Sequence, residues 1–303
     1  MRIVSLIASS TEIVCELGLE SSLVGRSHEC DYPHLILSLP QTTETKFPTT
    51  GTSPEIDDLI KDIVRRGLSV YRVDEEKLKE LNPDVLITQI QCEVCAVSEK
   101  DVKDALCNWL GSKPEIVALN PGGLKEIWDD IRKIAIATDV PERGEALITR
   151  LQNRMSAIRD KTKDLHHKPT VACIEWIEPL MSAGNWMPEL VERAGGINLF
   201  GRAGIHSPYM KWEDLVAQDP EVIYVMPCGW GIERARSEMH YLTSRKEWST
   251  LRAVRSGRVY LCDGNQYFNR PGPRVVESLE IMAETLHSDL FHFKNEGTGW
   301  VRF

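Results

Sequence analysis

An alternation of short apolar runs with amphipathic segments constrains the fold of this chain more than any other feature. The chain opens with RIVSLIA (2–8), SSTEIVCELGL (9–19) and SLVGRS (22–27), in the order strand, helix, strand. This order is typical of a parallel β-sheet covered by helices. The hydroxyl-rich corner at residues 9–12 predicts the N-cap of the first helix, and Gly18 predicts its end.

The same rhythm continues through the first 121 residues. Residues 54–66 predict a helix with acidic residues in its first turn and basic residues in its last, as the helix dipole favours. NPDVLIT (82–88) contains the continuous apolar run VLI, which favours a strand buried on both faces. This strand leads into TQIQCEVCAVS (88–98), at the sheet edge where ligands of open α/β folds usually bind.

The chain changes character after residue 121. Helical periodicity runs over 122–165 with one break near Pro141, and the alternation of strands and helices then resumes. We expect an N-terminal lobe over 1–121, a helical connector over 122–166 and a C-terminal lobe over 167–303. The predicted fold class is α/β, with two Rossmann-like lobes that contain parallel-type sheets and are joined by one long rigid helix.

Composition narrows the classes of partner. The 303 residues are 42% hydrophobic, which is enough for two cores, and the net charge is −9 without a long basic run. A nucleic-acid partner is therefore not expected. No apolar stretch approaches the ~20 residues of a transmembrane helix. The first residues lack the pattern of a secretory signal, so we expect a cytoplasmic protein, or a periplasmic one if a signal peptide has been removed.

Several longer motifs occur in a particular order along the chain. They are SLIASSTEIVCELG (5–18), CDYP (30–33), LNPDVLI (81–87), ERAGGINLF (192–200), WEDLVAQDPEVIYV (212–225) and GRVYLCDGNQYFNRPGPRVVESLEIMAETL (257–286). Together they resemble the substrate-binding proteins of cobalamin, haem and siderophore ABC importers, over essentially the whole chain. The CxxCAV loop at 92–97 is similar to that of a branch known as cobalamin-binding proteins. The resemblance implies a corrinoid ligand, and a permease partner if the protein is exported.

The loops that follow the predicted strands supply the candidate ligand-binding residues. They are rich in aromatic and amide side chains, which suits a large flat ligand with amides on its rim, such as a corrin ring. The first lobe offers Ser10, Glu29, Asp31, Tyr32, Gln89, Gln91, Cys92 and Cys95. The second lobe offers Trp176, Asn185, Trp186, Cys228, Gly229, Trp230, Asn265, Tyr267, Phe268, Arg270 and Arg274.

Three interpretations of the Cys92 and Cys95 pair remain open. With Cys30 and Cys228, which also lie on predicted loops, the pair could form a four-thiolate zinc or iron–sulfur site. A CxxC pair before a helix could also carry out redox chemistry. Finally, the pair could line the ligand site as an apolar wall or as a soft ligand for the cobalt of a corrinoid.

Catalytic motifs are absent from the sequence. It contains no G-x-S-x-G, G-x-x-x-x-G-K-[ST] or H-E-x-x-H motif, and no G-x-G-x-x-G after a strand. We therefore favour a protein that binds a small-molecule corrinoid, as a carrier, a sensor or an importer component, over an enzyme. The alternatives are a metal-dependent or iron–sulfur enzyme on the same scaffold, and a protein that binds haem or a ferric siderophore.

Overall fold

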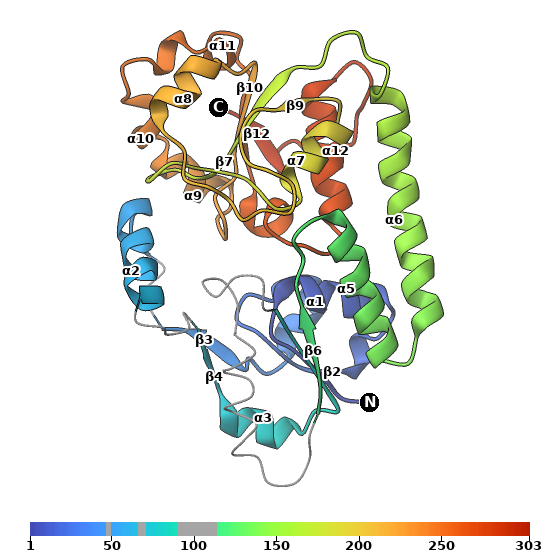
Figure 1. Cartoon of the computed structure of the whole chain (residues 1–303). Coiled ribbons are helices and arrows are strands. Elements are labelled where there is room, and N and C mark those ends of the chain that lie inside the picture. Colours follow the sequence, from blue (N-terminus) through green and yellow to red (C-terminus); the bar gives the residue numbers. More distant parts are fainter. Residues whose placement is uncertain (47–49, 66–70, 90–113) are drawn as a thin grey trace. The chain divides into compact units, whose positions relative to one another are not determined.

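The computed structural model describes residues 1–46, 50–65, 71–89 and 114–303 (Figure 1). Contacts within the chain divide it into two compact units. The first comprises residues 1–51, 55–121 and 125–150, and the second comprises residues 52–54, 122–124 and 151–303. Each unit contains its own parallel-type sheet with helices, so the predicted α/β class is confirmed.

The first unit is built around a four-stranded parallel sheet with the order β2-β1-β5-β6. Its strands are β1 (Ile3–Ser5), β2 (Leu23–Arg26), β5 (Val85–Gln89) and β6 (Glu115–Leu119), and β3 (Thr43–Thr45) forms a separate antiparallel pair with β4 (Tyr71–Val73). The accompanying helices are α1 (Ala8–Glu16), η1 (Glu20–Ser22), η2 (His34–Ser38), α2 (Ser53–Arg65) and α3 (Glu75–Leu81). β5 is buried along its whole length because it lies between β1 and β6, as its apolar run predicted.

The start of α1 corrects one prediction. Its N-cap is Ile7, and no side chain caps the helix. The hydroxyls at residues 9–11 already lie inside the first turn, and two of them bond toward β1 instead. Ser10 Oγ lies 2.6 Å from Ser5 Oγ, and Thr11 Oγ1 donates to Ser5 Oγ at 2.7 Å. The predicted end of the helix is confirmed, because Gly18 follows it with φ +73°.

Two consecutive helices account for the predicted helical stretch. They are α5 (Leu124–Ala137) and α6 (Pro141–Thr162). Asp139 has φ 59° in the turn between them, and Pro141 is the first residue of α6. Proline is tolerated there because the backbone N–H groups of a first helical turn have no partner within the helix. The break expected near Pro141 is therefore confirmed. The 22 residues of α6 pass from the first unit into the second. The lobe boundaries at residues 121 and 166 stay a prediction.

The second unit contains a six-stranded sheet with the order β12-β11-β10-β7-β8, and β9 also pairs with β7. Its strands are β7 (Thr170–Trp176), β8 (Met181–Ser182), β9 (Ile197–Asn198), β10 (Val222–Val225), β11 (Val259–Cys262) and β12 (Trp300–Arg302). Its helices are α7 (Met187–Arg193), α8 (Trp212–Gln218), α9 (Ile232–Glu238), α10 (His240–Thr243), η3 (Trp248–Thr250), α11 (Arg252–Arg255), the π-helical turn η4 (Gly264–Phe268) and α12 (Val275–Leu286). β7, β10 and β11 are parallel, so their carboxyl ends share one edge of the sheet.

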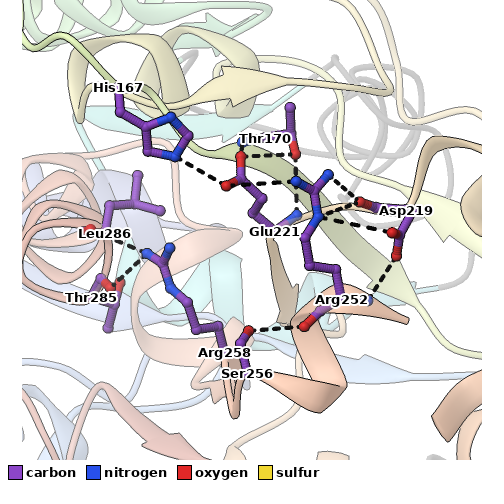
Figure 2. Close-up of polar contacts among 9 residues, drawn as sticks. All are labelled: His167, Thr170, Asp219, Glu221, Arg252, Ser256, Arg258, Thr285 and Leu286. Carbon is purple, nitrogen blue, oxygen red and sulfur yellow. Dashed lines mark hydrogen bonds and ion pairs between the residues drawn. The ribbon is translucent and has the colours of Figure 1, made fainter. Parts of the chain in front are cut away.

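A polar network joins elements at the opposite, amino edge of this sheet (Figure 2). The carboxylate of Glu221, just before β10, accepts a hydrogen bond from the backbone N–H of Thr170 in β7 at 3.0 Å, and its other oxygen lies 3.0 Å from His167 Nε2. The backbone N–H of Arg252, the first residue of α11, donates to Asp219 at 2.7 Å. These bonds connect the starts of β7, β10 and α11, so this edge has a structural role.

The C-terminal segment is held by one buried carboxylate. Glu284 in α12 accepts hydrogen bonds from the backbone N–H groups of Phe293, Lys294 and Asn295 at 2.8, 3.0 and 3.1 Å. It also accepts one from the indole N–H of Trp300 at 2.6 Å. The carboxylate therefore fixes the turn that leads into edge strand β12.

Within the described ranges, no helix combines the length and the apolar character needed to cross a membrane.

Candidate ligand-binding site

Two loops at the carboxyl edge of the second unit pack directly together. A Cβ atom at Gly264, just after β11, would lie 2.1 Å from the carbonyl oxygen of Pro227, just after β10, so only glycine fits there. The backbone N–H of Asn265 donates to the carbonyl of Trp230 at 3.1 Å. Asn269 Nδ2 donates to the carbonyl of Met226 at 3.1 Å. These contacts fix the loop that carries Trp230 against the loop that follows β11.

Three side chains from this edge form what we call the tryptophan–arginine cluster: Trp176, Trp230 and Arg234. The rings of Trp176, the last residue of β7, and Trp230 have centroids 4.8 Å apart and are tilted by 51°. The guanidinium carbon of Arg234 in α9 lies 4.6 Å from the centroid of the Trp230 ring, within the range of a cation–π interaction. Trp176 and Trp230 are 9% and 8% exposed. Two tryptophans predicted from separate loops are thus neighbours.

Trp186 and Phe268 have a structural role. The indole N–H of Trp186, at the start of α7, donates to the carbonyl of Phe268 at 3.2 Å. This bond joins α7 to η4. The Phe268 side chain has no exposed surface. The ring packs in the core of the unit, and its predicted contact with a ligand stays a prediction.

The loop after β11 carries two buried arginines, Arg270 and Arg274, which we call the arginine pair. They are 4% and 7% exposed. Arg270 Nη2 donates to Asn265 Oδ1 at 3.1 Å, and Arg274 Nη2 donates to Gln266 Oε1 at 2.9 Å. Arg274 also lies over the Tyr267 ring, 5.2 Å from its centroid. Side chains of the same loop therefore orient both guanidinium groups.

Asp263 supplies a negative charge next to the arginine pair. Its Oδ1 accepts a hydrogen bond from the backbone N–H of Gln266 at 2.6 Å. Burial raises the pKa of Asp263, while this backbone bond and the charges of Arg270 and Arg274 oppose that rise. The carboxyl group thus also organises the first turn of η4.

Three other predicted residues lie on loops of the second unit. Asn185 has φ 51°, and its backbone N–H donates to the carbonyl of Ile205 at 2.7 Å. Gly229 has φ +75°, and no heavy atom lies within 4 Å of the position that a Cβ would take. Cys228 is partly exposed. Gly229 and Cys228 therefore leave room beside Trp230 for another molecule to approach.

The loop after β2 in the first unit carries a second group of predicted residues. Tyr71 donates its hydroxyl to Glu29 Oε1 at 2.5 Å, which joins this loop to β4. Asp31 is partly buried, and Tyr32 is 40% exposed. The ring of His28 packs edge-on against Tyr71, with centroids 4.7 Å apart. The structure therefore brings Glu29 together with two residues that were not predicted.

His28 is held as a neutral side chain. Burial lowers its pKa to about 4, and the nearby charge of Arg26 acts in the same direction. Its Nδ1 lies 2.7 Å from Thr43 Oγ1, and its backbone N–H donates to the same oxygen at 3.1 Å. The imidazole is thus uncharged at neutral pH.

Ser10 and Gln89 lie at the start of α1 and the end of β5. Ser10 is fully buried, and its hydroxyl donates to the carbonyl of Ile7 at 3.0 Å as well as meeting Ser5. The hydroxyl joins α1 to β1, and the predicted contact of Ser10 with a ligand stays a prediction. Gln89 is buried at the carboxyl end of its strand, which is the predicted edge.

The proposed thiolate set receives no support from the described residues. Gln91, Cys92 and Cys95 lie outside them. Cys30 is fully buried, its Sγ accepts a hydrogen bond from Thr11 at 3.0 Å, and burial raises its pKa against the effect of that bond. A raised pKa favours the thiol over the metal-binding thiolate. Among the residues that the structure describes, no three His, Cys, Asp or Glu side chains gather as a metal site would require.

Sequence reasoning missed Arg234 and Tyr71. Arg234 follows Trp230 by four residues, a spacing that often places two side chains together near a helix start and could have indicated the contact. Tyr71 is 42 positions from Glu29, and no local pattern joins them.

The two α/β units, with mainly parallel sheets and the long helix α6 between them in the chain, define a class III substrate-binding protein fold. The chain belongs to the family described as periplasmic binding protein, whose model matches residues 3–266.

Individual relatives support this assignment. A vitamin B12-binding protein of Vibrio vulnificus is 23% identical, over 93% of this chain and 89% of the relative. The periplasmic vitamin B12-binding protein of Vibrio cholerae has a TM-score of 0.68 at 21% identity, with coverage of 96% of this chain and 98% of that one. A periplasmic haem-binding protein of Pseudomonas aeruginosa has a TM-score of 0.70 at 21% identity, with coverage of 95% and 92%. At these identities the structural likeness establishes the fold alone.

Proposed function

We propose that this protein binds a corrinoid, a cobalamin-like ligand, and serves as the substrate-binding component of an importer or as a corrinoid carrier. The named function of curated relatives that match nearly the whole chain supports this choice of ligand. Within the structure, the observation that carries the proposal is the tryptophan–arginine cluster at the carboxyl edge of the second unit.

The chemistry of this edge suits such a ligand. Indole rings give a large apolar contact area at small entropic cost. The open space beside Gly229 leaves the backbone next to Trp230 accessible. The side-chain amide of Asn265 belongs to the adjoining loop, and amides can pair with the amides on the rim of a corrin.

The proposal is tested by equilibrium dialysis against cyanocobalamin, with the bound ligand read from its visible absorption. Wild-type protein should bind saturably. Trp230→Phe removes the indole against which Trp176 and Arg234 pack, and should weaken binding about fivefold, which corresponds to about 1 kcal/mol. The matched control is Trp248→Phe, because Trp248 instead packs near Trp212 and Phe303.

Two outcomes would count against the proposal. If wild-type protein shows no saturable binding, the corrinoid function is wrong. If Trp230→Phe and Trp248→Phe both bind as wild type does, the ligand does not use the tryptophan–arginine cluster.

The compartment stays a prediction. We propose a cytoplasmic protein, with a periplasmic one as the alternative. Fractionation of the source cells with an antibody to the protein would separate the two.

A further inference from the structure

We propose that residues 52–54, which we call the strap, occupy hydrogen-bonding partners that the ligand uses, so that the strap must leave them before the ligand binds. This inference rests on the proposed corrinoid function and makes it more specific. The strap belongs to the second unit, although the chain on either side of it belongs to the first. Its central residue, Ser53, is the first residue of α2.

The first argument is the way in which the second unit holds Ser53. The residue has no exposed surface. Its backbone N–H and its hydroxyl both donate to Oε2 of Glu238 in α9, at 3.1 and 2.8 Å. Its carbonyl accepts a hydrogen bond from the indole N–H of Trp176 at 3.3 Å. One residue of the strap therefore engages both the N–H group of Trp176 and the carboxylate of Glu238.

The second argument is that Glu238 also contacts the tryptophan–arginine cluster. Its side chain is buried, with 4% of the residue exposed. Its Oε1 lies 3.5 Å from Nη2 of Arg234, and the guanidinium of Arg234 lies over the ring of Trp230. The strap is thus bound to the same group of side chains that the proposed ligand would contact.

The third argument is chemical similarity between the strap and the ligand. Ser53 presents an N–H donor to a carboxylate and a C=O acceptor to an indole, and an amide on the rim of a corrin carries the same two groups. Leaving a buried carboxylate and a buried indole N–H without partners is costly. The strap is therefore displaced by a ligand that replaces its hydrogen bonds, and the strap-bound state lowers the apparent affinity for that ligand.

Ser53→Ala tests this competition, because it removes one hydrogen bond of the strap and leaves Glu238 and Trp176 unchanged. Weaker attachment of the strap should raise the affinity for cyanocobalamin about fivefold in equilibrium dialysis. A contact that only stabilises the fold would leave the affinity unchanged or lower it. The matched control is Ser256→Ala, at an exposed position that follows α11, and it should bind cyanocobalamin as wild type does.

Hydrogen exchange of the wild-type protein gives a second measurement that requires no variant. The N–H of Ser53 is buried in its bond to Glu238, so it should exchange slowly without ligand. Saturating cyanocobalamin should speed its exchange by at least about tenfold, because the strap is released, while the amides of β10 should not exchange faster. Unchanged or slower exchange at Ser53 would refute the proposal. If Ser53→Ala does not fold, this measurement decides alone.

The two proposals fail in different ways. If wild type binds cyanocobalamin and folded Ser53→Ala binds it no more tightly, the strap does not compete with the ligand, and the corrinoid function stands. If Ser53→Ala binds cyanocobalamin and wild type does not, both proposals are supported. If neither protein binds cyanocobalamin, the corrinoid function is wrong, and the inference that rests on it is wrong as well.

Discussion

Replacing Gly264 by alanine tests whether the contact between the loops after β10 and β11 shapes the ligand site. The new Cβ would lie 2.1 Å from the carbonyl oxygen of Pro227 and 2.8 Å from that of Met226. Both obstacles are backbone atoms, so no side-chain rotation can relieve them. The loops would have to separate by roughly 1 Å, and overpacking of this kind costs about 1–3 kcal/mol.

The separation would also strain two hydrogen bonds between the same loops, from Asn265 to Trp230 and from Asn269 to Met226. At about 1 kcal/mol each, partial loss brings the expected destabilisation to about 3 kcal/mol. Urea unfolding followed by circular dichroism measures this change. Dialysis against cyanocobalamin should show an affinity at least about tenfold lower, because Trp230 moves from its place in the tryptophan–arginine cluster.

Gly231→Ala is the control. A Cβ at Gly231 meets Asp263 Oδ2 at 3.6 Å, an ordinary contact, and the residue has φ −77°, which alanine adopts freely. Its stability should stay within about 1 kcal/mol of wild type, because the lower entropy of the unfolded chain and the poorer N-cap of α9 act in opposite directions. If Gly264→Ala unfolds and binds ligand as Gly231→Ala does, the loop contact does not have the importance assigned to it.

Two further predictions concern stability. Glu284→Gln places an amide where four N–H donors need an acceptor, so it should lower the free energy of unfolding in urea by about 2–4 kcal/mol. The control, Glu296→Gln at an exposed position, should change that free energy by less than about 0.5 kcal/mol. Equal effects of the two variants would contradict the role of Glu284. Folding lowers the pKa of His28 from 6.5 to about 4, so as the pH falls the unfolded state takes up a proton before the folded state does. The stability that comes from keeping His28 neutral is therefore complete above pH 6.5 and is lost as the pH falls toward 4. Unfolding measured from pH 7 to pH 4 should therefore depend less on pH in His28→Gln than in wild type or in exposed His292→Gln, and three identical profiles would rule this out.

The sequence predicted the features that depend on local periodicity. The apolar run before Gln89 became the fully buried strand β5, and the interruption at Pro141 separates α5 from α6. Gly18 follows the end of α1 with positive φ, as helix ends require. These features could be predicted because strand and helix periods, and the backbone limits of proline and glycine, act over a few neighbouring residues.

The partners of individual side chains could not be predicted in this way. Ser10 was expected at a ligand surface, yet its hydroxyl bonds to Ser5 beneath α1, because the first turn had already begun at Ala8. Phe268 was expected beside the ligand, yet the turn η4 directs its ring into the core. A shift of a few residues in a helix start, or the conformation of one turn, decides which way such a side chain points.

The chain's α/β class and the loops that carry candidate ligand-binding residues were therefore determined by the sequence alone. Only the tertiary structure decided that Trp230 meets Trp176 and Arg234, and that Gly264 lies against Pro227. The physical reason is the strand order, which places β10 between β7 and β11 and so brings together loops more than thirty residues apart. Hydrophobic patterning specifies that each strand is buried, but neighbouring strands are chosen by the packing of the whole unit.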